Sequence, residues 1–258
     1  MRTIAEASRP RDLVQHLRDT TRLAVLLDYD GTLVPFAALP RQATPDDDLR
    51  RLLAALAVRP RTRVEIVSGR DPATLETWFG DLPIALRAEH GAWTRDTGGN
   101  GMWVASVPVQ KRTVTTAAER LSEITRRLGG WIEHKMTGAA WHHRDVAVSD
   151  TAVEEVVSEA KRQLLDLGFD VIHGNCVVEA RARGAHKGRA VHEALSRTPG
   201  STVVAIGDDT TDEDMFHALP EGKVGILVGS AQRATAAAHR LEHPRDVRAF
   251  LSALVASD

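Results

Sequence analysis

The sequence predicts an α/β protein with a parallel β-sheet core and a smaller α+β domain inserted into it. Apolar, strand-like segments alternate with helical segments near both ends of the chain, which is typical of a parallel sheet with helices on both faces. The middle of the chain follows a different pattern, a helix and then two strands, and this pattern occurs twice. Several apolar segments end in acidic or hydroxyl side chains, at the sheet edge where α/β proteins bind ligands.

The composition is that of a globular protein, and it disfavours several functional classes. The chain has 258 residues, 43% of them hydrophobic, and a formal net charge of −2, so we expect no nucleic-acid or membrane partner. Its single cysteine, Cys176, cannot form an intrachain disulfide. No segment has the roughly 20 apolar residues of a membrane span, and the charged residues 1–22 do not resemble a signal peptide. We therefore expect a cytoplasmic protein.

The N-terminal part of the chain supplies the first three predicted strands. Residues 23–27 are apolar throughout, as expected for a strand buried on both faces of a parallel sheet. Asp71 and Pro72 begin a helix, because aspartate is a good N-cap and proline is tolerated in the first turn. Strands are predicted over residues 23–27, 62–67 and 84–88, the last continuing into Glu89-His90-Gly91, and helices over residues 45–56 and from Asp71 onward.

The C-terminal part continues the same alternation. An apolar strand ends in Gly207-Asp208-Asp209, and Gly229 ends the strand after it. Strands are predicted over residues 201–206 and 224–228, and helices over residues 189–195 and 212–218. We expect these elements to join the same parallel sheet as the N-terminal strands.

The inserted domain is predicted over residues 108–183, which leaves residues 1–107 and 184–258 for the core domain. Two stretches of chain then connect the domains, an arrangement that suggests a hinge. Gly98 to Gly101 is predicted to be a hairpin tip, because no passage from a strand to a helix surrounds it.

Within the insertion, the pattern predicts an antiparallel sheet with two helices on one face and the other face open. Gly138 and Gly174-Asn175 supply the turns between strands, and Thr151 is the expected cap of the second helix. Helices are predicted over residues 111–128 and 152–167, and strands over residues 131–135, 139–143, 171–173 and 177–179.

Two acids follow the first strand. Asp28 and Asp30 are two residues apart, and side chains two apart on an extended chain point the same way. Gly31 permits a sharp turn directly after them. Neighbouring carboxylates repel each other unless a cation or a shared proton relieves the repulsion. The pair therefore indicates a divalent cation site, with Mg²⁺ as the expected ion; a loop with two solvated acids is the alternative.

Polar residues also end two further strands and precede one helix. They are Ser68, Asp208, Asp209 and Asp212, with Lys187 just before the helix predicted over residues 189–195. Because parallel strands end at the same edge of a sheet, we expect these side chains to surround one site. Taken singly, Ser68 and Asp212 could be helix caps and Lys187 a solvated surface residue.

Four motifs, in this order, resemble the haloacid dehalogenase (HAD) superfamily of aspartate-based phosphotransferases. They are Asp28-Tyr29-Asp30-Gly31-Thr32, Ser68-Gly69-Arg70, Lys187-Gly188, and Gly207-Asp208-Asp209 with Asp212. The resemblance implies a HAD-like Rossmannoid core. The long stretch between Ser68 and Lys187 implies an inserted cap domain of the type called C2, which is common among sugar phosphatases.

The resemblance also implies catalytic roles. Asp28 would be the nucleophile that forms an aspartyl-phosphate. Asp30 would protonate the leaving oxygen and later take a proton from water. Ser68 and Lys187 would bind the phosphoryl oxygens.

A metal site is implied in the same way. Mg²⁺ would be held by the carboxylates of Asp28 and Asp208 and by the backbone carbonyl of Asp30. Asp209 or Asp212 would be an outer or alternate metal ligand, and the sequence does not distinguish between these two.

Three regions are similar to the trehalose-6-phosphate phosphatase family within this superfamily. They are residues 28–35 (DYDGTLVP), residues 207–216 (GDDTTDEDMF) and the cap segments at residues 133–135 (EHK), 140–144 (AWHHR) and 179–181 (EAR). In that family a Glu-x-Lys pair and a second glutamate bind the sugar, which points to Glu133, Lys135 and Glu179. Further candidates for contacting phosphate or sugar, or for holding the site together, are Arg70, His90, His142, Arg144 and Arg181. Trp131 and Trp141 are expected to serve packing.

The resemblance implies a Mg²⁺-dependent phosphatase that releases trehalose and phosphate from trehalose 6-phosphate, with a functional link to a trehalose-phosphate synthase. The alternatives are a phosphatase for another sugar phosphate such as sucrose 6-phosphate, a sugar phosphomutase, and a non-catalytic sugar-phosphate sensor. The intact nucleophile, Asp28, argues against the sensor, because a protein that only binds its ligand has no need of it.

Overall fold

The structure is a computed structural model that describes residues 10–37, 39–97, 101–230 and 233–256. The chain divides into two compact units, one formed by Met1–Val104 with His186–Asp258 and the other by Ala105–Ala185. The second unit begins and ends slightly outside the predicted insertion, residues 108–183. The hairpin tip predicted at Gly98 to Gly101 falls largely outside the described residues.

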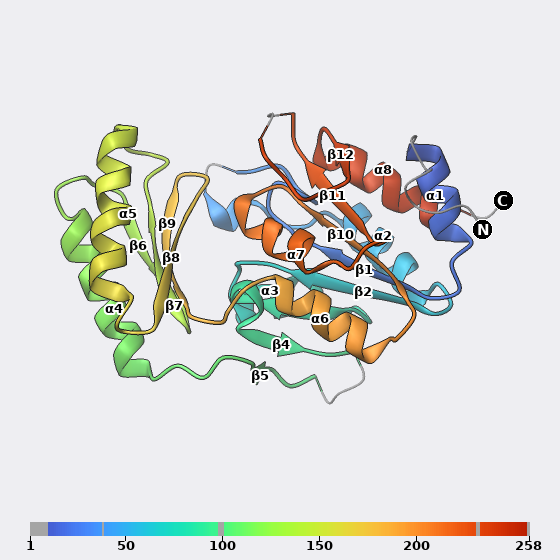
Figure 1. Cartoon of the computed structure of the whole chain (residues 1–258), viewed down its shortest axis with the longest axis horizontal. Helices are drawn as coiled ribbons and strands as arrows, with labels where there is room; N and C mark the ends of the chain where they lie inside the picture. The colour runs from blue at the N-terminus through green and yellow to red at the C-terminus, as the bar shows by residue number, and fades with distance from the viewer. Residues whose placement is uncertain (1–9, 38, 98–100, 231–232, 257–258) are drawn as a thin grey trace. The chain divides into compact units, whose positions relative to one another are not determined.

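The larger unit contains an eight-stranded sheet in the order β12-β11-β10-β1-β2-β3-β4-β5 (Figure 1). Neighbouring strands are parallel from β12 to β3, and β4 is antiparallel to β3. The strands are β1 (Leu23–Leu27), β2 (Thr62–Val67), β3 (Ala85–Ala88), β4 (Trp93–Arg95), β5 (Val104–Ala105), β10 (Thr202–Gly207), β11 (Val224–Val228) and β12 (His239–Leu241).

Helices cover both faces of this sheet. They are α1 (Pro10–Arg18), α2 (Asp47–Val58), α3 (Pro72–Phe79), α6 (Gly188–Arg197), α7 (Glu213–Ala218) and α8 (Pro244–Val255), with short 3₁₀ turns η2 (Pro40–Gln42), η3 (Glu89–Gly91) and η4 (Thr210–Asp212). Among the described residues, none of the helices combines the length and the apolar character that a membrane crossing requires.

The central strand β1 is buried on both faces, as its apolar sequence predicts. Leu23, Val25 and Leu27 pack into one hydrophobic cluster with residues of α1, α2, α3 and α8. Ala24 and Leu26 pack into the other cluster, with residues of α6 and α7. The alternation of side chains along the strand therefore divides β1 between two cores. Because β1 is a central strand, its carboxyl end lies near the middle of the row of strand ends.

Local sequence signals account for several boundaries in this unit. Asp71 caps α3 by accepting a hydrogen bond from the backbone N–H of Thr74 at 2.9 Å, and Pro72 lies in the first turn, so both predictions are confirmed. The helix predicted over residues 212–218 is divided into η4 and α7, because Asp209 caps a 3₁₀ turn first.

The smaller unit is a four-stranded antiparallel sheet with two helices. The strands, in the order β6-β7-β9-β8, are β6 (Trp131–His134), β7 (Gly138–His142), β9 (Val177–Ala182) and β8 (Phe169–Gly174), and the helices are α4 (Lys111–Thr125) and α5 (Asp150–Leu164). The two helices contact each other; α4 packs on β6 and β7, and α5 on β8 and β9. Both helices thus lie on one face of the sheet, as predicted.

The cap of α5 was predicted wrongly. The helix begins at Asp150, and the Oγ of Ser149 accepts the N–H of Ala152 at 3.2 Å. Ser149 has the extended backbone of an N-cap, whereas Thr151 lies inside the first turn. An N-cap must stand just outside the helix, so Thr151 cannot fill that position.

Replacing Ser149 with alanine should lower the free energy of unfolding by about 0.5–2 kcal/mol, because one N-terminal amide loses its partner. Thr151→Ala is the matched control, and it should change the same quantity by less than about 0.5 kcal/mol. Urea denaturation followed by circular dichroism measures both. Equal losses in the two variants would contradict the assignment of Ser149 as the cap.

Candidate active site

The candidate site lies at the carboxyl end of three adjacent strands. Asp28 directly follows β1, Ser68 follows β2, and Asp208 follows β10. Because β1 pairs in parallel with both β2 and β10, the three strand ends are neighbours. The backbone N–H of Asp28 still bonds to the carbonyl of Ile206 on β10 at 2.9 Å. The sheet therefore brings together residues that are up to 180 positions apart in the sequence.

Three acids form the centre of this site. Carboxylate oxygens of Asp28, Asp208 and Asp212 all lie within 4.8 Å of one another. Asp28 and Asp212 are buried, at 5% and 0% exposure. The hydroxyl of Thr32 donates to Oδ1 of Asp208 at 3.1 Å. Thr32 belongs to the motif after β1, but no contact was predicted for it.

Two glycines make room for these carboxylates. A Cβ on Gly31 would lie 2.3 Å from Oδ2 of Asp208, and Gly31 also has a φ of +82°. A Cβ on Gly207 would lie 2.1 Å from Cγ of Asp212. Distances this short are sterically forbidden, so glycine at both positions is a condition for the acid cluster.

Lys187 is the cation of the site. Its Nζ lies 2.6 Å from Oδ1 of Asp28 and 2.8 Å from Oδ1 of Asp212, and its side chain is 3% exposed. Burial disfavours the charged amine, but the carboxylates of Asp212 and Asp28 outweigh that effect and raise the pKa of Lys187. Lys187 therefore stays charged and offsets part of the negative charge of the acids.

The structure distinguishes Asp212 from Asp209, which the sequence could not do. Oδ2 of Asp212 accepts the backbone N–H groups of Asp208 and Asp209 at 2.9 and 3.0 Å, while its Oδ1 faces Lys187. The carboxylate of Asp209 instead accepts the N–H of Thr210 at 2.7 Å and caps η4. Asp212 is thus part of the acid cluster, and Asp209 shapes the loop beside it.

Two acids of the cluster, Asp28 and Asp208, have strongly raised pKa values. Burial, with the negative charges of Asp212 and Asp30, raises the pKa of Asp28 to about 7, although Lys187 acts in the opposite direction. Burial and the charges of Asp28 and Asp212 raise the pKa of Asp208 to about 10. Without a further cation the cluster retains protons at neutral pH. Hard oxygen ligands at this spacing fit a divalent ion such as Mg²⁺, which would replace those protons.

Arg70 holds the second acid of the first motif. Its Nε and Nη2 donate to Oδ2 and Oδ1 of Asp30 at 2.7 and 2.5 Å, a bidentate ion pair. The guanidinium carbon lies 5.1 Å from the ring centroid of Trp78. The sequence suggested a phosphate or sugar contact for Arg70, and no local pattern pointed to Asp30, because the two residues follow different strands.

A strained turn after β3 supports the loop that carries Ser68. Glu89 and His90 have φ values of +46° and +58°, a conformation that costs non-glycine residues roughly 1–2 kcal/mol each. Their N–H groups bond to the carbonyls of Arg70 and Ser68, both at 2.9 Å. The ring of His90 lies so close to Gly69 that a Cβ there would be 2.9 Å from it. His90 thus lies against the Ser68 loop.

In the smaller unit, the candidate sugar-binding residues share the face without helices. Glu133 on β6 lies opposite Ala140 on β7, and Ala140 lies opposite Glu179 on β9. The side chains of Glu133 and Glu179 therefore point to the same face of the sheet. Lys135 Nζ lies 2.8 Å from Oε2 of Glu179. Arg181 is two residues beyond Glu179 on β9 and faces the same way.

The remaining candidate residues of the smaller unit contact other parts of the same unit. His142 Nε2 lies 2.8 Å from Oε2 of Glu133, and its ring stacks on Trp131 at 4.2 Å between centroids. Trp141 is fully buried and donates to the carbonyl of Gly129 at 2.8 Å, which confirms its packing role. Arg144 donates to the carbonyl of Asn175 at 3.3 Å, at the tip of the β8–β9 hairpin.

Comparison with solved structures identifies the class of fold. A haloacid dehalogenase-like hydrolase from Bacteroides thetaiotaomicron superimposes with a TM-score of 0.63 over 90% of this chain and 98% of that one. At 16% identity this likeness concerns the fold alone. With the parallel sheet and the inserted α+β unit, it confirms the predicted HAD-like α/β class.

The family is identified by sequence. The model of the trehalose-phosphatase family matches residues 26–245, and the chain belongs to this family. The resemblance found in its motifs is thereby confirmed.

Two relatives show the extent of the similarity. The bifunctional trehalose-6-phosphate synthase/phosphatase of Thermoproteus tenax is 36% identical over 90% of this chain and 32% of its own length. The C-terminal domain of the C. albicans trehalose-6-phosphate phosphatase has a TM-score of 0.87 and 29% identity, with 96% of both chains covered. The chain spans about a third of the length of the curated relatives it matches first.

The raised pKa values of Asp28 and Asp208 predict how stability depends on pH. Both acids bind protons more tightly in the folded state than their ordinary value of 3.8 implies. Their contribution to stability is therefore complete below about pH 4 and is lost as pH rises through about 7 for Asp28 and toward about 10 for Asp208. The metal-free protein should become less stable between about pH 5 and about pH 8.

Thermal melting in EDTA across this pH range measures the effect. Asp28→Asn is the informative variant, because it removes the acid that titrates in this window, and its melting temperature should fall less steeply than that of the unchanged chain. Parallel pH profiles for the two proteins would contradict the assignment.

Proposed function

We propose that this chain is a Mg²⁺-dependent phosphatase that hydrolyses trehalose 6-phosphate to trehalose and phosphate. One observation carries the proposal. A buried aspartate, Asp28, contacts a buried lysine and lies beside two further acids at the carboxyl end of a parallel sheet, in a chain of the trehalose-phosphatase family. The likeness to a solved trehalose-6-phosphate phosphatase domain supports the choice of substrate.

Asp28 is the proposed nucleophile. A carboxylate oxygen attacks the phosphorus, the bond between phosphorus and the sugar oxygen breaks, and an aspartyl-phosphate forms. Asp30 gives a proton to the departing sugar oxygen and then accepts one from the water that attacks the phosphorus of the intermediate. Phosphate leaves, and the Asp28 carboxylate is restored. In the structure both oxygens of Asp30 accept from Arg70, so this ion pair must open before Asp30 can carry the proton.

Charge neutralisation is the main task of the surrounding residues. A phosphate monoester carries negative charge and is repelled by an attacking carboxylate, so positive charge must be in place first. Lys187 supplies a buried ammonium within 2.6 Å of Asp28. Ser68, 1% exposed at the end of β2, is placed to bind a phosphoryl oxygen through its hydroxyl.

The metal ligands in this proposal are the carboxylates of Asp28 and Asp208 and the backbone carbonyl of Asp30. Asp212 is the outer acid, because its two oxygens are already bonded to Lys187 and to backbone N–H groups. Bound Mg²⁺ supplies positive charge to the phosphate and to the acids around it.

The smaller unit is the proposed cap domain, residues 108–183, joined to a core domain of residues 1–107 and 184–258. Glu133, Lys135 and Glu179 are the proposed sugar ligands, with Arg181 on the same face. Hydroxyl groups of the disaccharide would replace the present partners of these side chains, where Lys135 pairs with Glu179 and Glu133 with His142. A substrate without those hydroxyls would leave the polar groups unpaired, which is the physical basis of the proposed specificity.

The cellular setting is a further part of the proposal. Trehalose 6-phosphate must be made by a trehalose-phosphate synthase, and the relative from Thermoproteus tenax carries both activities in its name. We propose a functional link with such a synthase and a cytoplasmic location.

Phosphate release from a panel of esters tests the function. With Mg²⁺ present, trehalose 6-phosphate should be hydrolysed faster than sucrose 6-phosphate and glucose 6-phosphate, and EDTA should abolish the reaction. Asp28→Asn should reduce turnover to background while the protein stays folded, because the amide is not a nucleophile. Faster turnover of another ester would favour that substrate, and interconversion of sugar phosphates without free phosphate would favour a phosphomutase.

Alanine substitution of Glu133 or Lys135 tests the cap. Each variant should lose about 10- to 100-fold in kcat/KM for trehalose 6-phosphate, since a hydrogen bond to a charged group is worth about 1.5–3 kcal/mol. Hydrolysis of p-nitrophenyl phosphate, which has no sugar, should change little. His134→Ala is the matched control, because His134 pairs with Ala139 and faces the other side of the same strand. Equal losses on both esters would exclude a role in sugar binding.

A further inference from the structure

Arg233, between β11 and β12, bonds to the backbone of the loop that carries Asp208. Its Nη2 donates to the carbonyl oxygens of Asp208 and Asp209 at 3.2 and 3.0 Å. Its Nη1 donates to Oε1 of Glu213 at 2.9 Å. The side chain is 26% exposed. Nothing in the local sequence singles out this arginine.

Glu213 orients the guanidinium. It is the first residue of α7, and its second oxygen, Oε2, accepts the backbone N–H of Ala236 at 2.9 Å. One carboxylate therefore joins the start of α7 to the segment that carries Arg233. This bidentate use of Glu213 restricts where the arginine side chain can stand.

The peptide groups around Asp208 are consequently held from two directions. Their N–H groups, at Asp208 and Asp209, donate to Asp212, and their carbonyls accept from Arg233. Restraint matters once these acids lose their protons, because carboxylates within 4.8 Å repel one another and would push the loop outward.

We propose that Arg233 is a positioning residue for Asp208. By holding the backbone of Asp208, it keeps the acids of the cluster at the spacing that a divalent cation needs. Because the cluster is taken as a Mg²⁺ site, this role rests on the proposed function. Residues that orient metal ligands typically contribute about 10- to 100-fold to metal affinity. Arg233 acts on the metal site through Asp208 and does not itself touch the substrate.

Calorimetric titration of Mg²⁺ into the metal-free full chain tests the proposal without measuring activity. Arg233→Gln should raise the Kd for Mg²⁺ by about 10- to 100-fold. Arg233→Lys should give a smaller increase, because lysine keeps the charge but cannot reproduce the forked geometry. In phosphate-release assays, the Mg²⁺ concentration for half-maximal rate should rise by the same factor, and the rate at saturating Mg²⁺ should be retained.

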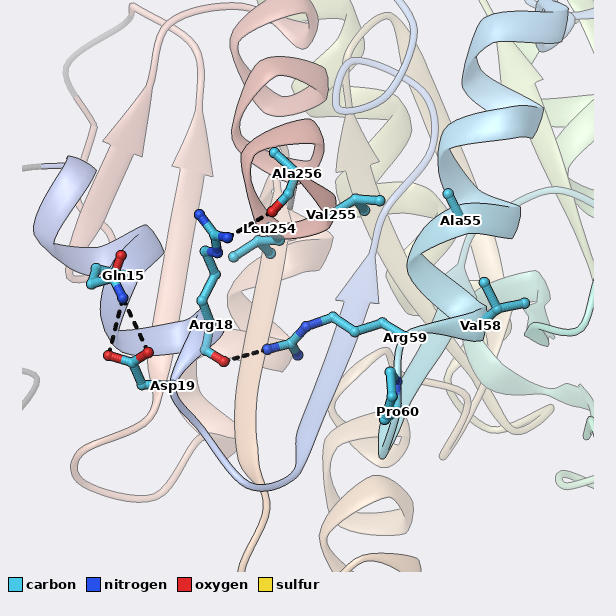
Figure 2. A pocket seen from close by; sticks show the side chains of 10 residues that line it. All are labelled: Gln15, Arg18, Asp19, Ala55, Val58, Arg59, Pro60, Leu254, Val255 and Ala256. Atoms are coloured by element: carbon cyan, nitrogen blue, oxygen red, sulfur yellow. Dashed lines mark hydrogen bonds between the residues drawn. The ribbon is translucent and has the colours of Figure 1, made fainter. Parts of the chain in front are cut away.

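Arg59 provides a matched control at the amino ends of the strands, opposite to the candidate site. Its Nη2 also donates to two successive carbonyls, those of Leu17 and Arg18, at 3.3 and 2.6 Å. It lines a cavity of about 400 Å³ near the amino ends of β1 and β2, where the bond to Arg18 is seen in Figure 2. Arg59→Gln should lower the melting temperature and leave the Kd for Mg²⁺ unchanged.

The outcomes separate this proposal from the proposed function. If the unchanged chain binds no Mg²⁺, the proposed cofactor is wrong and the role of Arg233 falls with it. If the unchanged chain binds Mg²⁺ and folded Arg233→Gln binds it equally well, Arg233 is only structural. If Arg233→Gln does not fold, Arg233→Lys takes its place. A Kd for Mg²⁺ in Arg233→Lys that equals the Kd of the unchanged chain and of the Arg59→Gln control overturns the proposal in the same way.

Discussion

The contact of Lys187 with Asp28 and Asp212 is the interaction on which the candidate site depends. Three acids converge in a largely buried space, and this ammonium lies between two of them. Burial, together with the negative charge of the neighbouring acids that one ammonium cannot offset, raises the pKa values of Asp28 and Asp208. A divalent cation would offset this excess and leave the site able to accept a negatively charged phosphate ester. The arrangement of charges thus supports the proposed metal site.

The sheet topology makes that convergence possible. The central strand β1 is buried between two hydrophobic clusters and has β2 and β10 as parallel neighbours. Each strand therefore delivers the residue that directly follows it to the same edge of the sheet. Gly31 and Gly207 allow the acid side chains to approach where any Cβ would collide with them. Around this edge, Arg70, Glu213 and Arg233 hold loops and side chains whose charges would otherwise drive them apart.

Features set by short-range patterns were predictable. The apolar run of β1, the Asp71-Pro72 helix start and the repeated helix–strand–strand pattern each depend on neighbours within a few residues. Errors arose where a local choice was ambiguous. Ser149 and Thr151 both carry hydroxyls that can cap a helix, and only the backbone geometry selects Ser149. The order of the strands in the sheet of the smaller unit, β6-β7-β9-β8, likewise depends on pairing between segments far apart in the chain.

The sequence by itself determined the chemical character of the site. In the motif Asp28-Tyr29-Asp30-Gly31-Thr32 the two acids are two residues apart, and side chains at this spacing on an extended chain point in the same direction. It also determined membership of the family. Only the tertiary structure decided which side chains meet: Arg70 with Asp30, Asp212 rather than Asp209 with Lys187, and Arg233 with the backbone of Asp208. Side-chain direction along a strand is a local property, whereas contacts between distant segments depend on how the whole core packs.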